Sequence, residues 1–463
     1  MFKDFRTASR PSPLPAAGPV PPPPRPRPVP ATAVVTPVPE AGWHDLKQAL
    51  HEAILSQMNL ALIEQVDRAD LKREIGALIS PILQDRGQSL GADRYRQLVA
   101  ELLDEVLGLG PLEPLLADPS VSDILVNGPD KIFVERRGLL ERSSLRFRDE
   151  KHLLRIIDKI VSRVGRRIDE SQPYVDARLP DGSRINAIIK PCAIDGASLS
   201  IRKFSADKLT LDKLVGFGAL SETAAQFLSA CVQARMNTLI SGGTGSGKTT
   251  MLNAMSAFID HRQRIVTIED AAELQLQQDH VVRLETRPAN AEGIGLISQR
   301  ELVKNALRMR PDRIVIGEVR GSEAFDMLQA MNTGHDGSMT TIHANTARDA
   351  IARLEQMVVM IGADFPMSAV RAQIGAGIQI VVQLNRLADG SRRVMSISEV
   401  TGLENGVVLM QDLFRFNKTG LDAEGQVTGA FGPTGIRPRC MDQLRAAGFD
   451  LPLGTFTAAP VAS

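Results

Sequence analysis

The chain has 463 residues, 43% hydrophobic and 23% charged, and its 54 Lys and Arg residues balance 54 Asp and Glu residues. This length and composition predict two or three ordinary globular domains. A net charge of zero excludes the strong positive field that non-specific nucleic-acid binding exploits, but it does not exclude a local basic groove. The three cysteines, Cys192, Cys231 and Cys440, form no C-x-x-C pair, so neither a disulfide framework nor a structural zinc site is predicted.

The sequence predicts a cytosolic protein. No apolar run approaches the ~20 residues that cross a bilayer. The first residues also lack the apolar core of a signal peptide. We therefore expect the chain to reach a membrane only by docking on other proteins.

The first 109 residues fall into two segments. Residues 1–42 are rich in Pro, Ala and Val, which predicts a disordered tail, and a spacer is favoured over a ligand for a proline-binding module. In residues 43–109 apolar side chains recur at helical spacing, which predicts a bundle of three helices. The first of these helices is marked by Leu46, Leu50, Ile54, Met58 and Leu62. The bundle is either a docking module or a structural cap.

Two mixed domains and a short segment are expected to follow. Residues 110–205 carry strand patterns near 123–126, 131–135, 184–189 and 199–203 and a helix near 151–164, which predicts an α+β domain. Residues 206–402 show the alternation of an α/β nucleotide-binding domain. Residues 403–463 are rich in glycine and polar residues and predict a small appended segment, with Phe414, Phe416 and Phe431 as isolated anchors.

The most informative stretch matches the phosphate-loop pattern G-x-x-x-x-G-K-[ST] between an apolar strand and a helix. Glycines let backbone N–H groups turn toward an anion, Lys248 supplies a positive charge, and the Thr249 hydroxyl supplies a Mg²⁺ ligand. The predicted ATP-binding residues are Gly242, Gly243, Thr244, Gly245, Ser246, Gly247, Lys248, Thr249 and Thr250.

Two further apolar strands end in acids. Ile314–Glu318 and Ile265–Glu269 both have this form. Because the carboxyl ends of parallel strands meet at the ligand crevice, Glu269 and Glu318 can both face the phosphates. Either could orient the attacking water. We favour Glu269 for that role and Glu318 as the group that holds Mg²⁺ through water, together with Thr249.

Histidines and arginines complete the set of candidates for catalysis. His335 and His343 flank a threonine-rich strand, and an imidazole near a γ-phosphate can sense its loss, with His343 the stronger candidate. Planar guanidinium groups that reach across a cleft can stabilise charge in phosphoryl transfer. The arginines so placed are Arg178, Arg184 and Arg202 in the α+β domain and Arg283 and Arg287 in the next.

Taken together, residues 242–250, 267–270, 317–321 and 334–345 resemble the Walker A, Asp, Walker B and His boxes of secretion ATPases. Residues 118–128 and 284–288 most resemble the CpaF/TadA-type motor of tight-adherence (type IVc) pilus systems. The resemblance covers about residues 90–440 and implies a RecA-like P-loop ATPase domain that uses ATP and Mg²⁺. It also implies a PAS-like domain before it and nucleotide held between the two. The four-cysteine zinc module of many type II secretion ATPases is absent, which disfavours that branch.

The same resemblance implies partners and a place in the cell. We expect a homo-hexamer that acts on platform proteins at the cytoplasmic face of the inner membrane and powers pilus assembly or retraction. The N-terminal tail could contact polar-localisation or regulatory partners.

Two rival functions are weighed. A type IV secretion ATPase for protein or DNA export shares every box. A RecA-like nucleic-acid motor is disfavoured, because the chain is neutral and only 4% of its residues are aromatic, so no nucleic-acid partner is expected.

Overall fold

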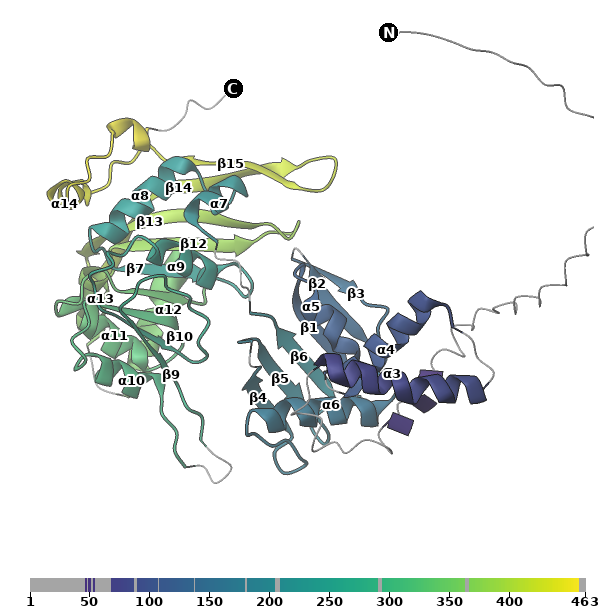
Figure 1. The fold of residues 1–463 in the computed structure, drawn as a ribbon. Coiled ribbons are helices and arrows are strands. Elements are labelled where there is room, and N and C mark those ends of the chain that lie inside the picture. Colours follow the sequence, from purple (N-terminus) through teal and green to yellow (C-terminus); the bar gives the residue numbers. More distant parts are fainter. Residues whose placement is uncertain are drawn as a thin grey trace, which may run out of the picture. The chain divides into compact units, whose positions relative to one another are not determined.

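The computed structural model describes residues 46, 47, 49, 50, 53, 54, 68–86, 90–106, 108–136, 138–179, 181–204, 209–289, 294–362 and 366–457. These divide into two compact units, one ending at Val106 and one beginning at Leu107 (Figure 1). The predicted tail over residues 1–42 lies outside the described residues.

The first unit is helical. It contains α3 (Arg68–Asp85) and α4 (Ala92–Val106), and residues 46, 47, 49, 50, 53 and 54 also have helical backbone. Leu46, Leu50 and Ile54 are buried, as their i, i+4 spacing requires of one helix face. Met58 and Leu62, predicted for the same face, lie outside the described residues. The described helices thus bury the apolar stripes of the sequence against one another.

The second unit begins with an antiparallel sheet of six strands in the order β3-β2-β1-β6-β5-β4. Its strands are β1 (Val121–Asn127), β2 (Ile132–Arg136), β3 (Leu139–Arg142), β4 (Tyr174–Arg178), β5 (Arg184–Ile188) and β6 (Ser198–Arg202). The helices of this part are η1 (Gly110–Leu112), α5 (Glu113–Ala117) and α6 (Glu150–Arg163). Helix α6 begins where the Asp149 side chain accepts from His152 N, and its Ile156, Ile157 and Ile160 enter the core of the sheet.

A larger sheet of nine strands forms the rest of the unit, in the order β15-β14-β13-β12-β7-β11-β10-β8-β9. Its strands are β7 (Thr238–Gly242), β8 (Ile265–Glu269), β9 (Val281–Glu285), β10 (Arg313–Val319), β11 (Met339–Ile342), β12 (Ile380–Arg386), β13 (Arg392–Glu404), β14 (Val407–Leu421) and β15 (Val427–Pro433). The run from β12 to β9 is parallel, and β13, β14 and β15 add to it antiparallel. The predicted α/β fold is confirmed.

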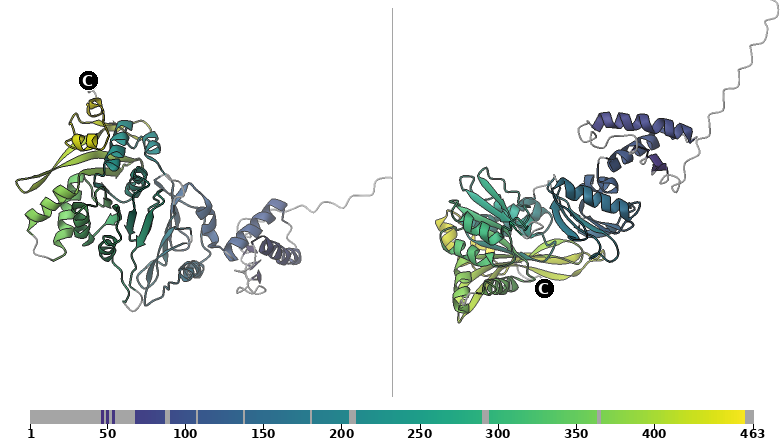
Figure 2. Two further views of the ribbon diagram at one scale, coloured as in Figure 1. Left: turned by 60° about the vertical axis from the view of Figure 1, so that its left-hand side comes forward. Right: turned by 90° about the horizontal axis from the view of Figure 1, so that it is seen from below.

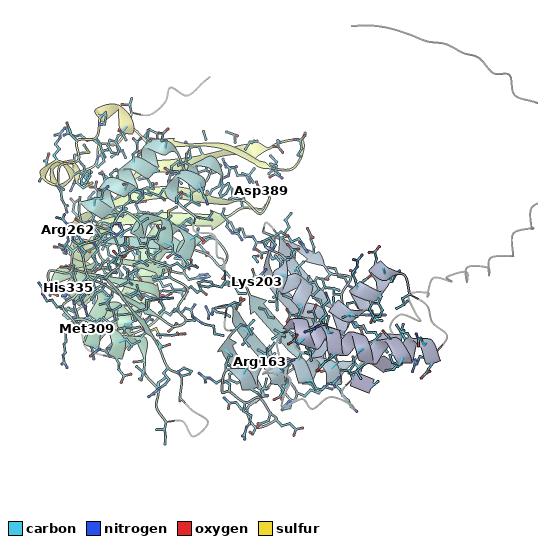
Figure 3. All side chains as sticks on the ribbon, viewed as in Figure 1. Arg163, Lys203, Arg262, Met309, His335 and Asp389 are labelled. Atoms are coloured by element: carbon cyan, nitrogen blue, oxygen red, sulfur yellow. The ribbon has the colours of Figure 1, made fainter. Side chains whose placement is uncertain are left out.

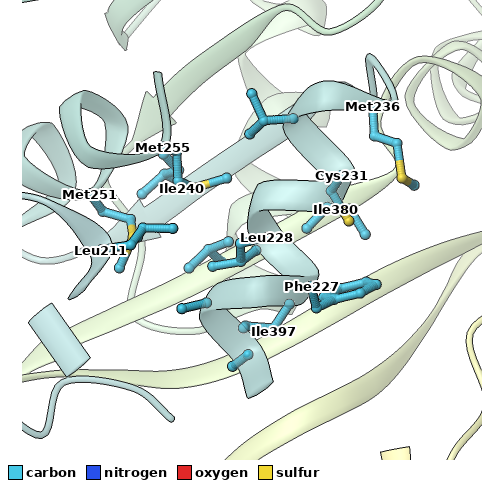
Figure 4. Packing of buried hydrophobic residues seen from close by; sticks show 14 of the residues in the cluster. Leu211, Phe227, Leu228, Cys231, Met236, Ile240, Met251, Met255, Ile380 and Ile397 are labelled. Carbon is cyan, nitrogen blue, oxygen red and sulfur yellow. The ribbon is translucent and has the colours of Figure 1, made fainter. Parts of the chain in front are cut away.

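Helices cover both faces of this sheet, as the views in Figures 1 and 2 show. The helices are α7 (Leu211–Gly216), α8 (Glu222–Gln233), α9 (Lys248–Ser256), α10 (Gln299–Ala306), α11 (Glu323–Asn332), α12 (Ala347–Val359) and α13 (Met367–Gly377). Successive strand residues point to opposite faces, so Ile240 packs under α8 and α9, and Leu239 packs under α11 and α12. Figure 4 shows the first of these cores, with Phe227 and Leu228 of α8 set against Ile240 and Ile380.

The order of the strands determines where the phosphate loop and Glu318 lie. One strand, β11, lies between β7, which leads into the phosphate loop, and β10, which carries Glu318. Because these strands are parallel, their carboxyl ends meet at one edge of the sheet. This RecA-like order brings segments that are distant in sequence to the phosphate loop.

The segment after residue 402 is an integral part of the sheet, which corrects the expectation of an appended piece. The predicted boundary falls inside β13, and β14 pairs with β13 over most of its length. Phe414 is fully buried, with ring centroids 5.8 Å from Phe227 and 5.7 Å from Phe456. The aromatic residues therefore complete the core over α8. After β15 the chain forms α14 (Met441–Ala446) and η2 (Leu453–Phe456).

Replacement of Phe414 by Ala tests this role. Removing a buried ring leaves a cavity, so we expect Phe414→Ala to lower the free energy of unfolding by about 3–5 kcal/mol, measured by urea denaturation. Phe217, which is 70% exposed, is the control, and Phe217→Ala should cost less than about 0.5 kcal/mol. Equal, small effects of both changes would show that the last strands add little to the fold.

Candidate active site

The phosphate loop joins β7 to α9, and its conformation requires glycine. Gly245 and Gly247 have φ of +68° and +95°, a region that side chains disfavour. A Cβ on Gly242 would lie 2.4 Å from Ser246 Oγ and 2.6 Å from Leu384 O, so the loop folds closely against β12. The sequence pattern is thus matched by a backbone that only these glycines permit.

Lys248 is the charged residue of the loop. Its Nζ lies 3.0 Å from Gly243 O, so the ammonium group folds over the turn. Burial lowers the pKa of Lys248 from its usual value, while Glu318 opposes that shift. An anion placed in the loop would therefore meet a partly desolvated cation, for which electrostatic attraction is strong.

Glu269, at the end of β8, is almost completely buried. Its Oε2 accepts from Glu273 N at 2.7 Å and Leu274 N at 2.8 Å, and its Oε1 is buried with no partner among the described residues. Burial raises the pKa of Glu269 to about 6, against these two hydrogen bonds, which lower it. A carboxylate with one free oxygen and such a pKa is suited to accept a proton from water.

Glu318 is directed to the same place by an irregularity in β10. Ile316 and Val319 pair with Thr340 and Ile342, so β10 has one residue more than β11 across this interval. A bulge of this kind redirects a side chain at the edge of a sheet. The site also depends on Gly317, because a Cβ there would lie 3.0 Å from Glu269 Cγ.

A small cavity of about 50 Å³ is lined by both acids. The residues around it are Arg184, Thr249, Glu269, Asp270, Ala271, Glu273, Gly317, Glu318 and Arg320. The described residues contain no cluster of three or more His, Cys, Asp or Glu side chains that could hold a metal. Mg²⁺ at a phosphate site needs only one or two protein oxygens, since it keeps several waters and takes phosphate oxygens. The Thr249 hydroxyl and Glu318 fit that requirement.

Arg184 brings positive charge from the α+β sheet to this cavity. It begins β5, and its Nη1 lies 2.8 Å from Glu273 Oε1. It lines the cavity of the two acids and also a cavity of about 230 Å³ with Thr249 and Thr250. Arg184 is therefore the predicted arginine that lies nearest the candidate chemistry.

The other predicted arginines are more widely spread. Arg178 Nη1 donates to Ala272 O at 2.8 Å. Arg202 lines the 230 Å³ cavity, and its Nε lies 3.1 Å from Asp123 Oδ1. Arg287 and Arg178 share a larger cavity of about 760 Å³. Arg283 is exposed on the edge strand β9, where its charge lowers the pKa of Glu269.

The two histidines lie at opposite ends of β11. His343 follows Ile342, which pairs with Ser241 beside the phosphate loop. His335 precedes Met339, which pairs with Thr238 at the start of β7, so it lies at the far edge of the sheet, as Figure 3 shows. The four residues of β11 lie between the two histidines, so His335 is placed away from the phosphate loop and is not retained as a candidate γ-phosphate sensor.

Sequence reasoning assigned no role to Arg320. Its Nη2 lies 2.7 Å from Glu318 Oε2, and this hydrogen bond is the largest cause of the raised pKa of Arg320. Nη1 lies 3.6 Å from Asp270 Oδ2, so the guanidinium joins the ends of β8 and β10. The sequence feature that could have indicated this role is the position of Arg320, two residues after Glu318 at the end of an apolar strand.

The raised pKa of Glu269 predicts that the free energy of unfolding decreases as the pH rises. A pKa raised from 4.5 to about 6 means that the folded state binds the proton more tightly than the unfolded chain. The associated stability is present below pH 4.5 and is lost as pH rises through 6, by about 2 kcal/mol. We expect the free energy of unfolding of wild type to fall over this window relative to Glu269→Gln, measured by denaturation at each pH. Parallel pH curves for the two proteins would contradict the burial of this carboxyl.

The chain is similar in sequence to proteins of transfer and secretion systems. Among the described residues no helix is both long and apolar enough to span a membrane. A protein of Mycobacterium tuberculosis strain H37Rv, named for conjugal transfer, is 41% identical over 312 residues, covering 66% of this chain and 88% of that one. Type IV secretion system protein VirB11 of Bartonella quintana is 32% identical, covering 62% and 91%.

Solved structures and a family model extend the comparison. The VirB11 ATPase of Brucella suis is 30% identical with a TM-score of 0.35, covering 62% of this chain and 94% of that one. The pilus retraction motor PilT has 23% identity, a TM-score of 0.46 and coverages of 62% and 80%. Residues 105–427 match the family described as Type II/IV secretion system protein. The chain belongs to that family.

Proposed function

We propose that this chain is an ATPase motor that powers assembly of a tight-adherence type IV pilus at the cytoplasmic face of the inner membrane. The observation that carries the ATPase part of the proposal is the small cavity on which Thr249, Glu269, Glu318 and Arg184 converge. The pilus part rests on the resemblance of residues 118–128 and 284–288 to tight-adherence motors. A phosphate loop, two carboxylates and a guanidinium are the groups that phosphoryl transfer to water requires. Membership of a secretion family supports the coupling of this reaction to transport.

Each residue of the site has its own role in the proposed hydrolysis. The loop amides and Lys248 hold the phosphates, and Glu269 orients the attacking water and accepts its proton through the free Oε1. Arg184 stabilises the charge that develops on the transferred group. Mg²⁺, when bound by Thr249 and by Glu318 through water, would neutralise charge on the phosphate oxygens. His343 lies at the same edge of the sheet and is retained as the candidate sensor.

Hydrolysis is coupled to movement through the arginines of the α+β domain. Arg184 is held by Glu273, and Arg178 by Ala272 O and by Glu285 at 3.3 Å. A γ-phosphate in the site competes with Glu273 for Arg184, and ADP does not. A contact that differs between the two nucleotides shifts the domain equilibrium. We further propose a homo-hexamer that acts on membrane platform proteins, with regulatory partners at the N-terminal tail and no nucleic-acid partner.

Type IV secretion is the second candidate function. It is favoured by the relatives, since one is named for conjugal transfer and another is a type IV secretion protein. An export motor of this kind would use the same residues in the same roles. The two candidates differ in what the motor moves rather than in how it hydrolyses ATP.

Two substitutions test the ATPase. We expect Lys248→Ala to weaken nucleotide binding and to abolish turnover, because the loop loses its cation. Glu318→Gln should still bind nucleotide but lose hydrolysis by about 100-fold or more, since it keeps its shape and loses its charge. Phosphate release and binding of a fluorescent nucleotide are the measurements, with Glu141→Gln, an exposed acid on β3, as the control. Wild-type turnover in either variant would refute the assignment.

Imaging of cells separates the two functions. Deletion of the gene and the Lys248→Ala point mutant should both remove surface filaments, because assembly needs the motor. Expression of the wild-type gene in the deletion strain is the control and should restore them. Intact filaments together with failed export of protein or DNA would favour the second candidate.

A further inference from the structure

The turn between β12 and β13 lies on the outer side of the phosphate loop. Leu384 of β12 pairs with Gly242, and β12 then continues past the point where β7 ends. Arg386 and Arg392 face each other across the two strands, and Asp389, labelled in Figure 3, marks the turn between them. The two strands thereby bring two guanidinium groups to the outer side of the phosphate loop.

Arg392 is bonded directly to the loop. Its Nε donates to Gly245 O at 2.8 Å, and a Cβ on Gly247 would lie 3.8 Å from its Cδ. A Cβ on Gly245 would lie 3.5 Å from Arg386 Nη1. Both arginines therefore pack on the backbone of the two residues that have positive φ.

Both guanidinium groups share one carboxylate from the α+β sheet. Glu135 of β2 lies 3.0 Å from Arg392 Nη2 through Oε1 and 3.3 Å from Arg386 Nη1 through Oε2. Its side chain is only 13% exposed, whereas those of Arg386 and Arg392 are 31% and 41% exposed, so the carboxylate is the most shielded member of the group. Arg386 also donates to Gly138 O beyond the end of β2. A Cβ on Gly138 would lie 2.8 Å from Gly390 O, so the two turns are in close contact.

We propose that Glu135, Arg386 and Arg392 form a clamp through which the α+β domain sets the conformation of the phosphate loop. These three are positioning residues, since none of them lines the cavity of the two acids. The inference rests on the proposed ATPase function and adds a second route between the domains, separate from Arg184.

The clamp acts through the peptide bond after Gly245. A trans peptide is planar, so its C=O and the next N–H point in opposite directions. When Arg392 holds Gly245 O, the N–H of Ser246 must point the opposite way, where it donates to Gly243 O at 3.4 Å. That N–H is among the donors that a phosphate would meet. Glu135 keeps Arg392 in the rotamer that makes this bond, which preorganises the phosphate loop.

The consequence is that domain position controls nucleotide affinity. If the α+β sheet moves away, Glu135 no longer holds the two arginines, and the Gly245 peptide is free to rotate. Nucleotide binding should then weaken, because ordering the loop costs conformational entropy. By linkage, bound nucleotide favours the closed clamp to the same extent.

A double-mutant cycle on the full-length protein tests the clamp. We expect Glu135→Gln and Arg392→Ala each to raise the Kd for ADP and the KM for ATP by about 3- to 30-fold, with kcat changed less. Their combination should be no worse than the more severe single change, because both break one unit. Arg392→Lys should restore the Kd and KM only in part, since a single ammonium nitrogen replaces the fixed Nε and Nη2 donors that reach Gly245 O and Glu135.

The controls exclude a general loss of stability. Glu141→Gln on the neighbouring strand and Arg415→Ala on β14 each remove an exposed charge and should leave Kd and KM unchanged. Thermal midpoints of all variants should match wild type, whereas a structural role would lower the midpoint and the active fraction together. The clamp would be refuted if the effects of the two single changes on Kd add in the double variant, or if the Kd of Glu135→Gln stays within about twofold of wild type. Either result would leave the proposed ATPase function standing. Absence of nucleotide binding in wild type would refute both the clamp and the proposed ATPase.

Discussion

The parallel pairing of β7, β11, β10 and β8 is the constraint on which the rest of the structure depends. Parallel strands end at one edge, and residues separated by dozens of positions in the chain meet there. Thr249 follows β7, Glu269 ends β8, and Glu318 lies near the end of β10. Helices on both faces bury the strands and hold that edge rigid. The site is consequently built from strand ends and does not depend on flexible loops for its acids.

Within this edge, the two carboxylates are made different by their surroundings. Glu269 is buried and bonded by backbone amides, which leaves one oxygen free and raises its pKa. Glu318 is held by Arg320 and lies where β10 bulges. A buried acid with a raised pKa suits proton transfer, and an acid that shares a cavity with the Thr249 hydroxyl suits a metal. These environments support the proposed division of roles between the two acids.

The α+β sheet contributes charges of both signs to the nine-stranded sheet. Arg184 and Arg178 reach acids and a carbonyl after β8, and Glu135 reaches two arginines beside the phosphate loop. Both sets of contacts are electrostatic, and both involve groups that a nucleotide phosphate can attract or organise. A motor of the secretion family needs such contacts, because only an interaction that changes with the nucleotide can move one domain against another.

The sequence alone indicated the phosphate loop, the acids Glu269 and Glu318 and the strands that lead into them. It also indicated four strands and one helix of the α+β domain, because all of these depend on local patterns of glycine, charge and apolar spacing. It indicated the family through the same boxes. The tertiary structure decided which end of β11 faces the loop, and so separated His343 from His335. It also joined the strands after residue 402 to the main sheet and paired Glu135 with Arg386 and Arg392. These features depend on strand order and on contacts between residues far apart in the chain, which no local pattern encodes.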